Sequence, residues 1–95
     1  MVAYVIGEID VTDAKRYQDY AKVAGPVLAK YGAKALARAG ELVVFEGEPA
    51  GGRIVVLEFP SLEEARRWYH SEDYAGPKAI RQEASKATFF AVEGV

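Results

Sequence analysis

His70 is the only histidine of this chain, and its side chain is the one that titrates closest to neutral pH. It lies in a stretch of aromatic, polar and acidic residues that runs from Trp68 to Asp73. In one interpretation, His70 is a general acid or base at the mouth of a pocket. In the other, it faces solvent where a helix ends, and its imidazolium form interacts favourably with the helix dipole. We favour the second interpretation, because functional histidines are scarce.

Aromatic side chains form a second group of candidate functional residues. They lie on two stretches of helical spacing and comprise Tyr17, Tyr20, Tyr31, Trp68, Tyr69 and Tyr74. Such residues can line a cavity for a planar ligand, with phenol hydroxyls that orient it. More often they fill a core with one polar end reaching water. Both interpretations remain open at this point.

Gly7 leaves a position without a side chain in an otherwise apolar strand pattern. If a large ring from a helix rests on Gly7, the position is structural. If no ring fills the space, Gly7 is the floor of a pocket. The ligand-binding residues that we predict are Gly7, Tyr17, Trp68, His70 and Tyr74, with His70 near the pocket mouth. No catalytic residue is assigned.

Glu8 and Glu58 form a third candidate group, because both occupy the even phase of their strands. We expect these two strands to be parallel neighbours, which would bring the carboxylates together. Two close carboxylates raise one pKa and suit acid–base chemistry. The alternative, which we favour, is an acid cluster neutralised by Arg38 or by a cation of a partner chain.

Composition disfavours several other kinds of site. The chain has no cysteine and one histidine, so we predict no metal site and no cofactor. The net charge is −2 and no basic run occurs, so we expect no nucleic-acid partner. Gly7, Glu8 and Asp10 interrupt the first apolar run, so we expect no signal peptide, no membrane association and a cytoplasmic location.

The clearest structural pattern runs from Arg53 to Tyr69. The apolar, mostly β-branched residues 54–57 predict a strand. Pro60 ends the strand, because it cannot donate a hydrogen bond to a neighbouring strand. Ser61 and Glu64 then form a capping-box pattern that begins a helix.

The other patterns complete a β-α-β-β-α-β order, which is that of the ferredoxin-like α+β fold with a four-stranded antiparallel sheet and two main helices on one face. They predict strands over residues 2–11, 33–46 and 88–92, with a bulge near 39–40 and a loop over 46–53. They also predict a helix over 13–32 that bends or restarts at 25–26. Further helical residues, 80–84, are expected after breaks at 70–73 and 76–77. At 95 residues the chain is expected to be one domain, 1–95.

Both faces of the first and third strands are largely apolar, so the sheet needs a cover on each side. The helices cover one face, and the same face of a second copy is an economical cover for the other. We therefore predict a homodimer that forms by sheet-to-sheet packing.

Several segments together resemble the bacterial family known as domain of unknown function 1330, in the dimeric α/β-barrel superfamily. They are Asp13-x-x-x-Tyr17-x-x-Tyr20, Tyr31-Gly32 and Glu58-Phe59-Pro60-Ser61, continued by Ala65, Trp68-Tyr69, Ser71 and Tyr74. The resemblance spans nearly the whole chain and implies a ferredoxin-like subunit in a sheet-to-sheet dimer. Distant superfamily relatives include cofactor-independent monooxygenases and ligand-sensing domains, but none of their catalytic residues can be transferred here.

The sequence therefore predicts an uncharacterised small soluble protein with a pocket between sheet and helices. The leading hypothesis is binding of, or acid–base chemistry on, a small aromatic or carbonyl metabolite. The alternative is a non-enzymatic ligand-binding or structural homodimer without a catalytic site.

Overall fold

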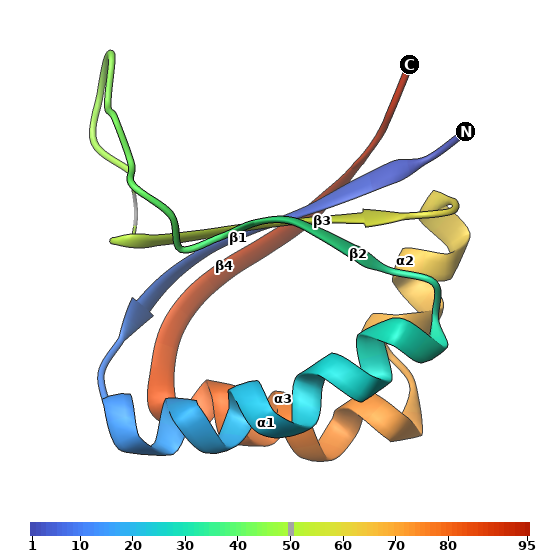
Figure 1. Ribbon diagram of the computed structural model, residues 1–95, viewed down its shortest axis with the longest axis horizontal. Coiled ribbons are helices and arrows are strands. Elements are labelled where there is room, and N and C mark those ends of the chain that lie inside the picture. Colours follow the sequence, from blue (N-terminus) through green and yellow to red (C-terminus); the bar gives the residue numbers. More distant parts are fainter. Residues whose placement is uncertain (50) are drawn as a thin grey trace.

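The computed structural model describes residues 1–49 and 51–95, and Figure 1 shows its elements. They are β1 (Ala3–Val11), α1 (Ala14–Lys30), β2 (Lys34–Arg38), β3 (Arg53–Phe59), α2 (Leu62–Tyr69), α3 (Glu72–Ala84) and β4 (Ser85–Glu93). The described residues contain no helix that is long and apolar enough to cross a bilayer.

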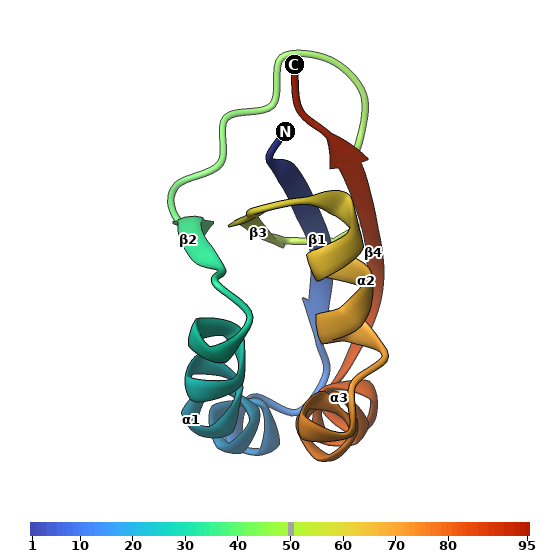
Figure 2. The same cartoon turned by 90° about the vertical axis from the view of Figure 1, so that its right-hand side faces the viewer.

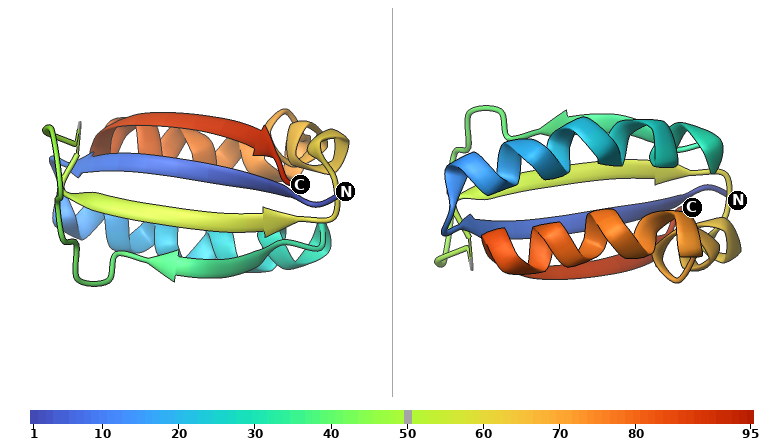
Figure 3. Two further views of the ribbon diagram at one scale, coloured as in Figure 1. Left: turned by 90° about the horizontal axis from the view of Figure 1, so that it is seen from above. Right: turned by 90° about the horizontal axis from the view of Figure 1, so that it is seen from below.

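The four strands form one antiparallel sheet in the order β2-β3-β1-β4, and all helices lie on one of its faces (Figure 3). This architecture confirms the predicted ferredoxin-like fold, with the second helical region divided into α2 and α3. The expectation that β1 and β3 run parallel is wrong. Between them the chain makes one helical crossover and then one direct return from β2 to β3, so β1 and β3 point in opposite directions.

Burial alternates along β1, as its period of two requires. Val5 and Ile9 are buried toward the helices, whereas Ile6 is only half-buried on the opposite face. The core lies between sheet and helices, and its largest fully buried side chains are Trp68, Tyr74, Phe59 and Ile9.

Helices α1 and α3 lie side by side beneath opposite edges of the sheet (Figure 2). Asp13 caps α1 by accepting a hydrogen bond from the backbone N–H of Arg16 at 3.0 Å. At the other end of α1, Lys30 forms a 2.8 Å ion pair with Asp73 of α3. Arg16 pairs with Glu83 at the opposite end of the helix pair, at 3.2 Å. These two ion pairs join both ends of α1 to α3.

The predicted helix start at Ser61 is confirmed, because its hydroxyl accepts a 3.1 Å hydrogen bond from the backbone N–H of Glu64. The break predicted at 70–73 is confirmed at its first two residues, since His70 caps the end of α2 and Ser71 caps the start of α3. Its last two residues, Glu72 and Asp73, already belong to α3.

The helix break predicted at 76–77 is wrong, because α3 continues through Pro77. Helix α1 continues through Pro26, so it does not restart at 25–26. Proline restricts the residue before it partly by a clash with that residue's Cβ. Gly25 and Gly76 have no Cβ, so this part of the restriction is absent.

Strand β2 is shorter than the predicted 33–46. Its ladder ends at Arg38, because Ala39 adopts a left-handed backbone with φ of 56°. The irregularity in its pairing lies between Ala35 and Ala37, earlier than the bulge expected near 39–40. The following residues leave the sheet on the side opposite the helices (Figure 1), where Phe45 is 95% exposed. Ala50, in the expected 46–53 loop, lies outside the described residues.

Candidate functional site

A cavity of about 150 Å³ lies between α1 and the sheet, and we call it the α1 cavity. Helix α1 contributes small and aromatic residues to it, and the strands contribute apolar side chains and two arginines. Its lining comprises Ile9, Tyr17, Tyr20, Ala21, Ala24, Gly25, Leu28, Arg38, Arg53, Val55, Leu57 and Phe89. A cavity of this size holds a benzene-sized ring in a protein core.

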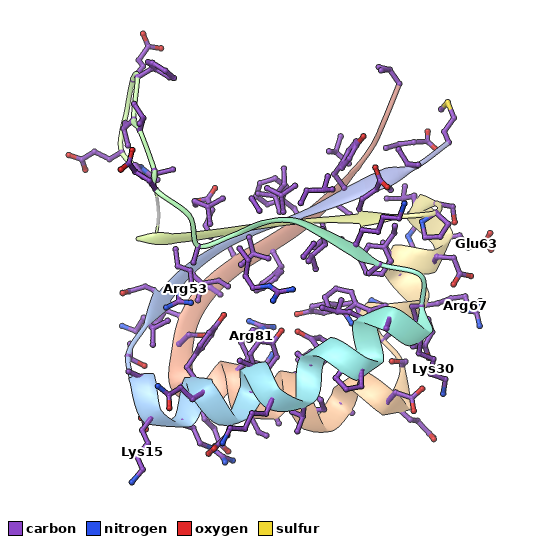
Figure 4. All side chains as sticks on the ribbon, in the orientation of Figure 1. Lys15, Lys30, Arg53, Glu63, Arg67 and Arg81 are labelled. Atoms are coloured by element: carbon purple, nitrogen blue, oxygen red, sulfur yellow. The ribbon has the colours of Figure 1, made fainter. Side chains whose placement is uncertain are left out.

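Arg38 and Arg53 give the α1 cavity its positive charge. The two residues end β2 and begin β3, so the sheet brings them to the same end of the cavity. Arg53 points from the sheet toward the helix layer (Figure 4), and its guanidinium lies 5.1 Å from the centroid of the Tyr17 ring. No carboxylate lines the cavity, and neither arginine has an ion-pair partner among residues 1–49 and 51–95.

A chain of hydrogen bonds joins the α1 cavity to α3. The Tyr20 and Tyr74 hydroxyl oxygens are 2.8 Å apart. Arg81 donates from Nε to the Tyr74 hydroxyl at 3.3 Å and from a terminal nitrogen to the Tyr69 hydroxyl at 3.4 Å. The Arg81 guanidinium also lies 4.2 Å from the centroid of the Phe89 ring. Arg81 therefore holds its charge inside the helix–sheet layer by hydroxyl and aromatic contacts (Figure 4).

Burial sets the protonation of the cavity tyrosines. It raises the pKa of Tyr17, against the lowering effect of the Arg53 charge. It also raises the pKa of Tyr20, well above the ordinary tyrosine value of 10.0. Both hydroxyls are therefore neutral at physiological pH, and they can donate hydrogen bonds but do not serve as bases.

A second cavity, of about 140 Å³, lies between α2 and the β1–β4 side of the sheet, and we call it the α2 cavity. Trp68, Tyr69, His70 and Phe89 belong to its lining. His70 is exposed and its ring meets the Tyr69 ring edge-on, with centroids 5.4 Å apart. The structure thus places His70 at the end of α2, exposed and in the lining of the α2 cavity.

The predicted ligand-binding residues do not share one pocket. Tyr17 lines the α1 cavity, Trp68 and His70 line the α2 cavity, and Tyr74 is fully buried between them. Gly7 faces the helices as expected, but it is not a pocket floor. A Cβ on Gly7 would lie 2.6 Å from the Phe89 ring, because Phe89 of β4 pairs with Gly7 and fills the space above it.

The predicted cluster of Glu8, Glu58 and Arg38 does not form, because β1 and β3 are antiparallel. Glu8 pairs with Ile54 near one end of β3, and Glu58 pairs with a residue at the other end of β1. Arg38 lines the α1 cavity on the helix side, whereas the acids have the opposite phase. Within the described residues, no group of three or more histidine, aspartate or glutamate side chains is arranged to hold a metal ion.

Sequence reasoning missed Arg53, Arg81 and Phe89 as site residues. One signal was present for Arg81, since it follows Tyr74 by seven positions and thus shares a helix face with it. The positions of Arg53 and Phe89 depend on strand pairing, which the sequence pattern left open.

The family described as "Domain of unknown function (DUF1330)" matches residues 2–95. The chain belongs to this family. A search among curated proteins finds no significant sequence match.

Solved structures of similar fold include the protein of unknown function RPA0582 from Rhodopseudomonas palustris. It has a TM-score of 0.79 and 15% sequence identity, with 99% of this chain and 82% of that chain covered. SnoaB, a cofactor-independent oxygenase from Streptomyces nogalater, has a TM-score of 0.63 and 8% identity over 99% and 93% of the two chains. A dimeric protein of unknown function and ferredoxin-like fold from Bacteroides fragilis has a TM-score of 0.57 and 13% identity, with coverage of 98% and 96%. At these identities the DUF1330 chain shares the fold with each of them.

Proposed function

We propose that this DUF1330 protein binds a small single-ring aromatic metabolite in the α1 cavity. The observation that carries the proposal is a ring-sized cavity whose aromatic and apolar walls meet two arginines without carboxylate partners among the described residues. The arginines, Arg38 and Arg53, favour a ligand that carries an anionic group at that end.

The cavity residues support binding better than acid–base chemistry. The described lining contains no histidine and no carboxylate, and burial keeps its two tyrosines protonated. SnoaB, of similar fold, is an oxygenase described as cofactor-independent. That likeness supports a small organic ligand in this fold without assigning the oxygenase reaction to this chain.

Binding is tested with benzoate as the probe, by amide NMR titration of the ¹⁵N-labelled protein. Benzoate should shift amides of α1 and β3, and Arg53→Gln should weaken its binding by roughly tenfold, as loss of one charge-assisted hydrogen bond predicts. Arg66→Gln is a matched control, because Arg66 lines the α2 cavity. Shifts confined to α2, or equal affinity of both variants, would contradict the proposal.

We also propose that the protein is a homodimer that buries the sheet face opposite the helices. Ile6 on this face pairs with Val56 on one side and with Phe90 on the other, and Phe90 is 46% exposed. These neighbours make an apolar centre with no helix over it (Figure 3). The similar protein from Bacteroides fragilis is dimeric, which supports this assembly.

Ile6→Glu should convert the dimer to a monomer in sedimentation equilibrium at micromolar concentration, because a stable interface of about 800 Å² per partner would bury the new charge. Val23→Glu is the control, since Val23 is a 41% exposed apolar residue of α1. A wild-type protein that sediments as a monomer would refute the dimer.

A further inference from the structure

Arg81 fixes the direction of the hydrogen bonds that lead to the α1 cavity. A guanidinium only donates hydrogen bonds, so the Tyr74 hydroxyl oxygen accepts the 3.3 Å bond from Arg81 Nε. Arg81 is 3% exposed and has no ion pair with a carboxylate in the described parts of the chain. A buried charge without a counterion depends on such hydroxyl contacts.

The Tyr74 hydroxyl in turn donates its hydrogen bond to Tyr20. Its side chain is 0% exposed, so its own proton must be donated inside the protein, and the Tyr20 oxygen at 2.8 Å is the acceptor. The reverse direction would leave the Tyr74 proton buried without a partner, which costs about 1–3 kcal/mol. The favoured order is therefore donation from Arg81 to Tyr74 and from Tyr74 to Tyr20.

Tyr20 then keeps one proton to donate. Tyr74 is its hydrogen-bond partner in the described structure, and in this order Tyr20 only accepts from it. Tyr20 lines the α1 cavity, so an acceptor atom of a bound molecule can take this proton. Successive hydrogen bonds polarise one another, so a donor at the end of a chain that starts at a cation is strengthened.

Resting on the proposed ligand cavity, we infer that Tyr20 is a ligand-binding residue whose hydroxyl donates a hydrogen bond to a carbonyl oxygen of the aromatic ligand. This assignment narrows the ligand class from aromatic molecules in general to aromatic carbonyl compounds. It also gives the cavity two polar ends, with Arg38 and Arg53 on the β2–β3 side and Tyr20 on the α3 side.

The test compares acetophenone with α-methylstyrene, which replaces the carbonyl oxygen by a methylene group in nearly the same shape. In the wild-type protein, acetophenone should bind about three- to tenfold more tightly, as expected for one net hydrogen bond. Tyr20→Phe should reduce this ratio to about one. Tyr31→Phe is the matched control, since Tyr31 lies outside the lining of the α1 cavity and its hydroxyl donates to the Asp73 carboxylate; the ratio should persist.

The outcomes separate this inference from the proposed function. If both compounds bind with equal affinity in the wild type, the cavity binds aromatics but the role of Tyr20 is overturned. If neither binds, the proposed cavity and this inference fail together. The infrared C=O stretch of acetophenone bound to the wild type gives a reading that needs no variant. A shift to lower frequency than in hydrocarbon solvent supports donation to the carbonyl, and an unshifted band overturns it.

Discussion

Gly7→Ala tests whether the Phe89 ring closes the space above β1. The new Cβ would lie 2.6 and 2.8 Å from two atoms of that ring, closer than carbon atoms approach without displacement. The Arg81 guanidinium lies 4.2 Å from the centroid of this ring, so the ring cannot shift without altering that contact. The substitution at Gly7 therefore disturbs both the Phe89 ring and its contact with Arg81.

The size of the effect follows from two opposing terms. Overpacking costs about 1–3 kcal/mol, and replacing a strand glycine by alanine returns about 0.5–1 kcal/mol of conformational free energy. The midpoints of these two ranges give a net loss of roughly 1 kcal/mol in the free energy of unfolding. For a domain of this length, such a loss lowers Tm by about 4–8 °C.

The assay is urea and thermal unfolding followed by circular dichroism, with all variants at the same protein concentration. Gly40→Ala is the control, because a Cβ there would meet no atom within 4 Å, and its stability should stay the same or rise slightly. In a Phe89→Leu background, Gly7→Ala should lose less than half as much stability as it does alone. An unchanged or higher stability of Gly7→Ala would refute the placement of the ring.

Three further outcomes follow from particular contacts. Trp68→Ala should lower the free energy of unfolding by about 3–5 kcal/mol, because Trp68 is 1% exposed; a loss under about 1 kcal/mol in urea unfolding would contradict its core position. The hydrogen bond from Lys30, and to a smaller extent that from Tyr31, lowers the pKa of Asp73. The ionised Asp73 therefore stabilises the folded state fully above the ordinary pKa of 3.8, and this stabilisation is lost as pH falls through the lower pKa of the folded state. When the free energy of unfolding is measured as a function of acid pH, Asp73→Asn should show a smaller loss of stability than the wild type. Identical pH profiles of the two proteins would contradict a stabilising role of the Asp73 carboxylate. Ala39→Gly should raise Tm, because Ala39 has φ of 56°, a backbone that costs about 1–2 kcal/mol for a residue with a Cβ; a lower Tm in thermal unfolding would contradict this.

The sequence by itself determined the elements whose signals are local. The Ser61 cap, the strand before Pro60 and the helix break after Tyr69 each depend on residues within one turn of one another, and the structure contains all three. The period of two likewise placed Val5, Gly7 and Ile9 on one face of β1, because strand side chains alternate regardless of their neighbours. Element order then led to the ferredoxin-like fold.

Tertiary structure decided the candidate site. Whether Glu8 and Glu58 meet depends on strand direction, and the antiparallel pairing of β1 with β3 separates them. Whether Gly7 floors a pocket depends on its cross-strand partner, which is Phe89.

The remaining site contacts join residues that lie far apart in the chain. Tyr20 and Tyr74 meet between two helices, α1 and α3, that are separated in the chain by β2, β3 and α2. Local patterns set which face a side chain takes, but they carry no information on which distant side chain it meets. Strand register and helix packing determine those contacts, and both are established only when the whole chain folds.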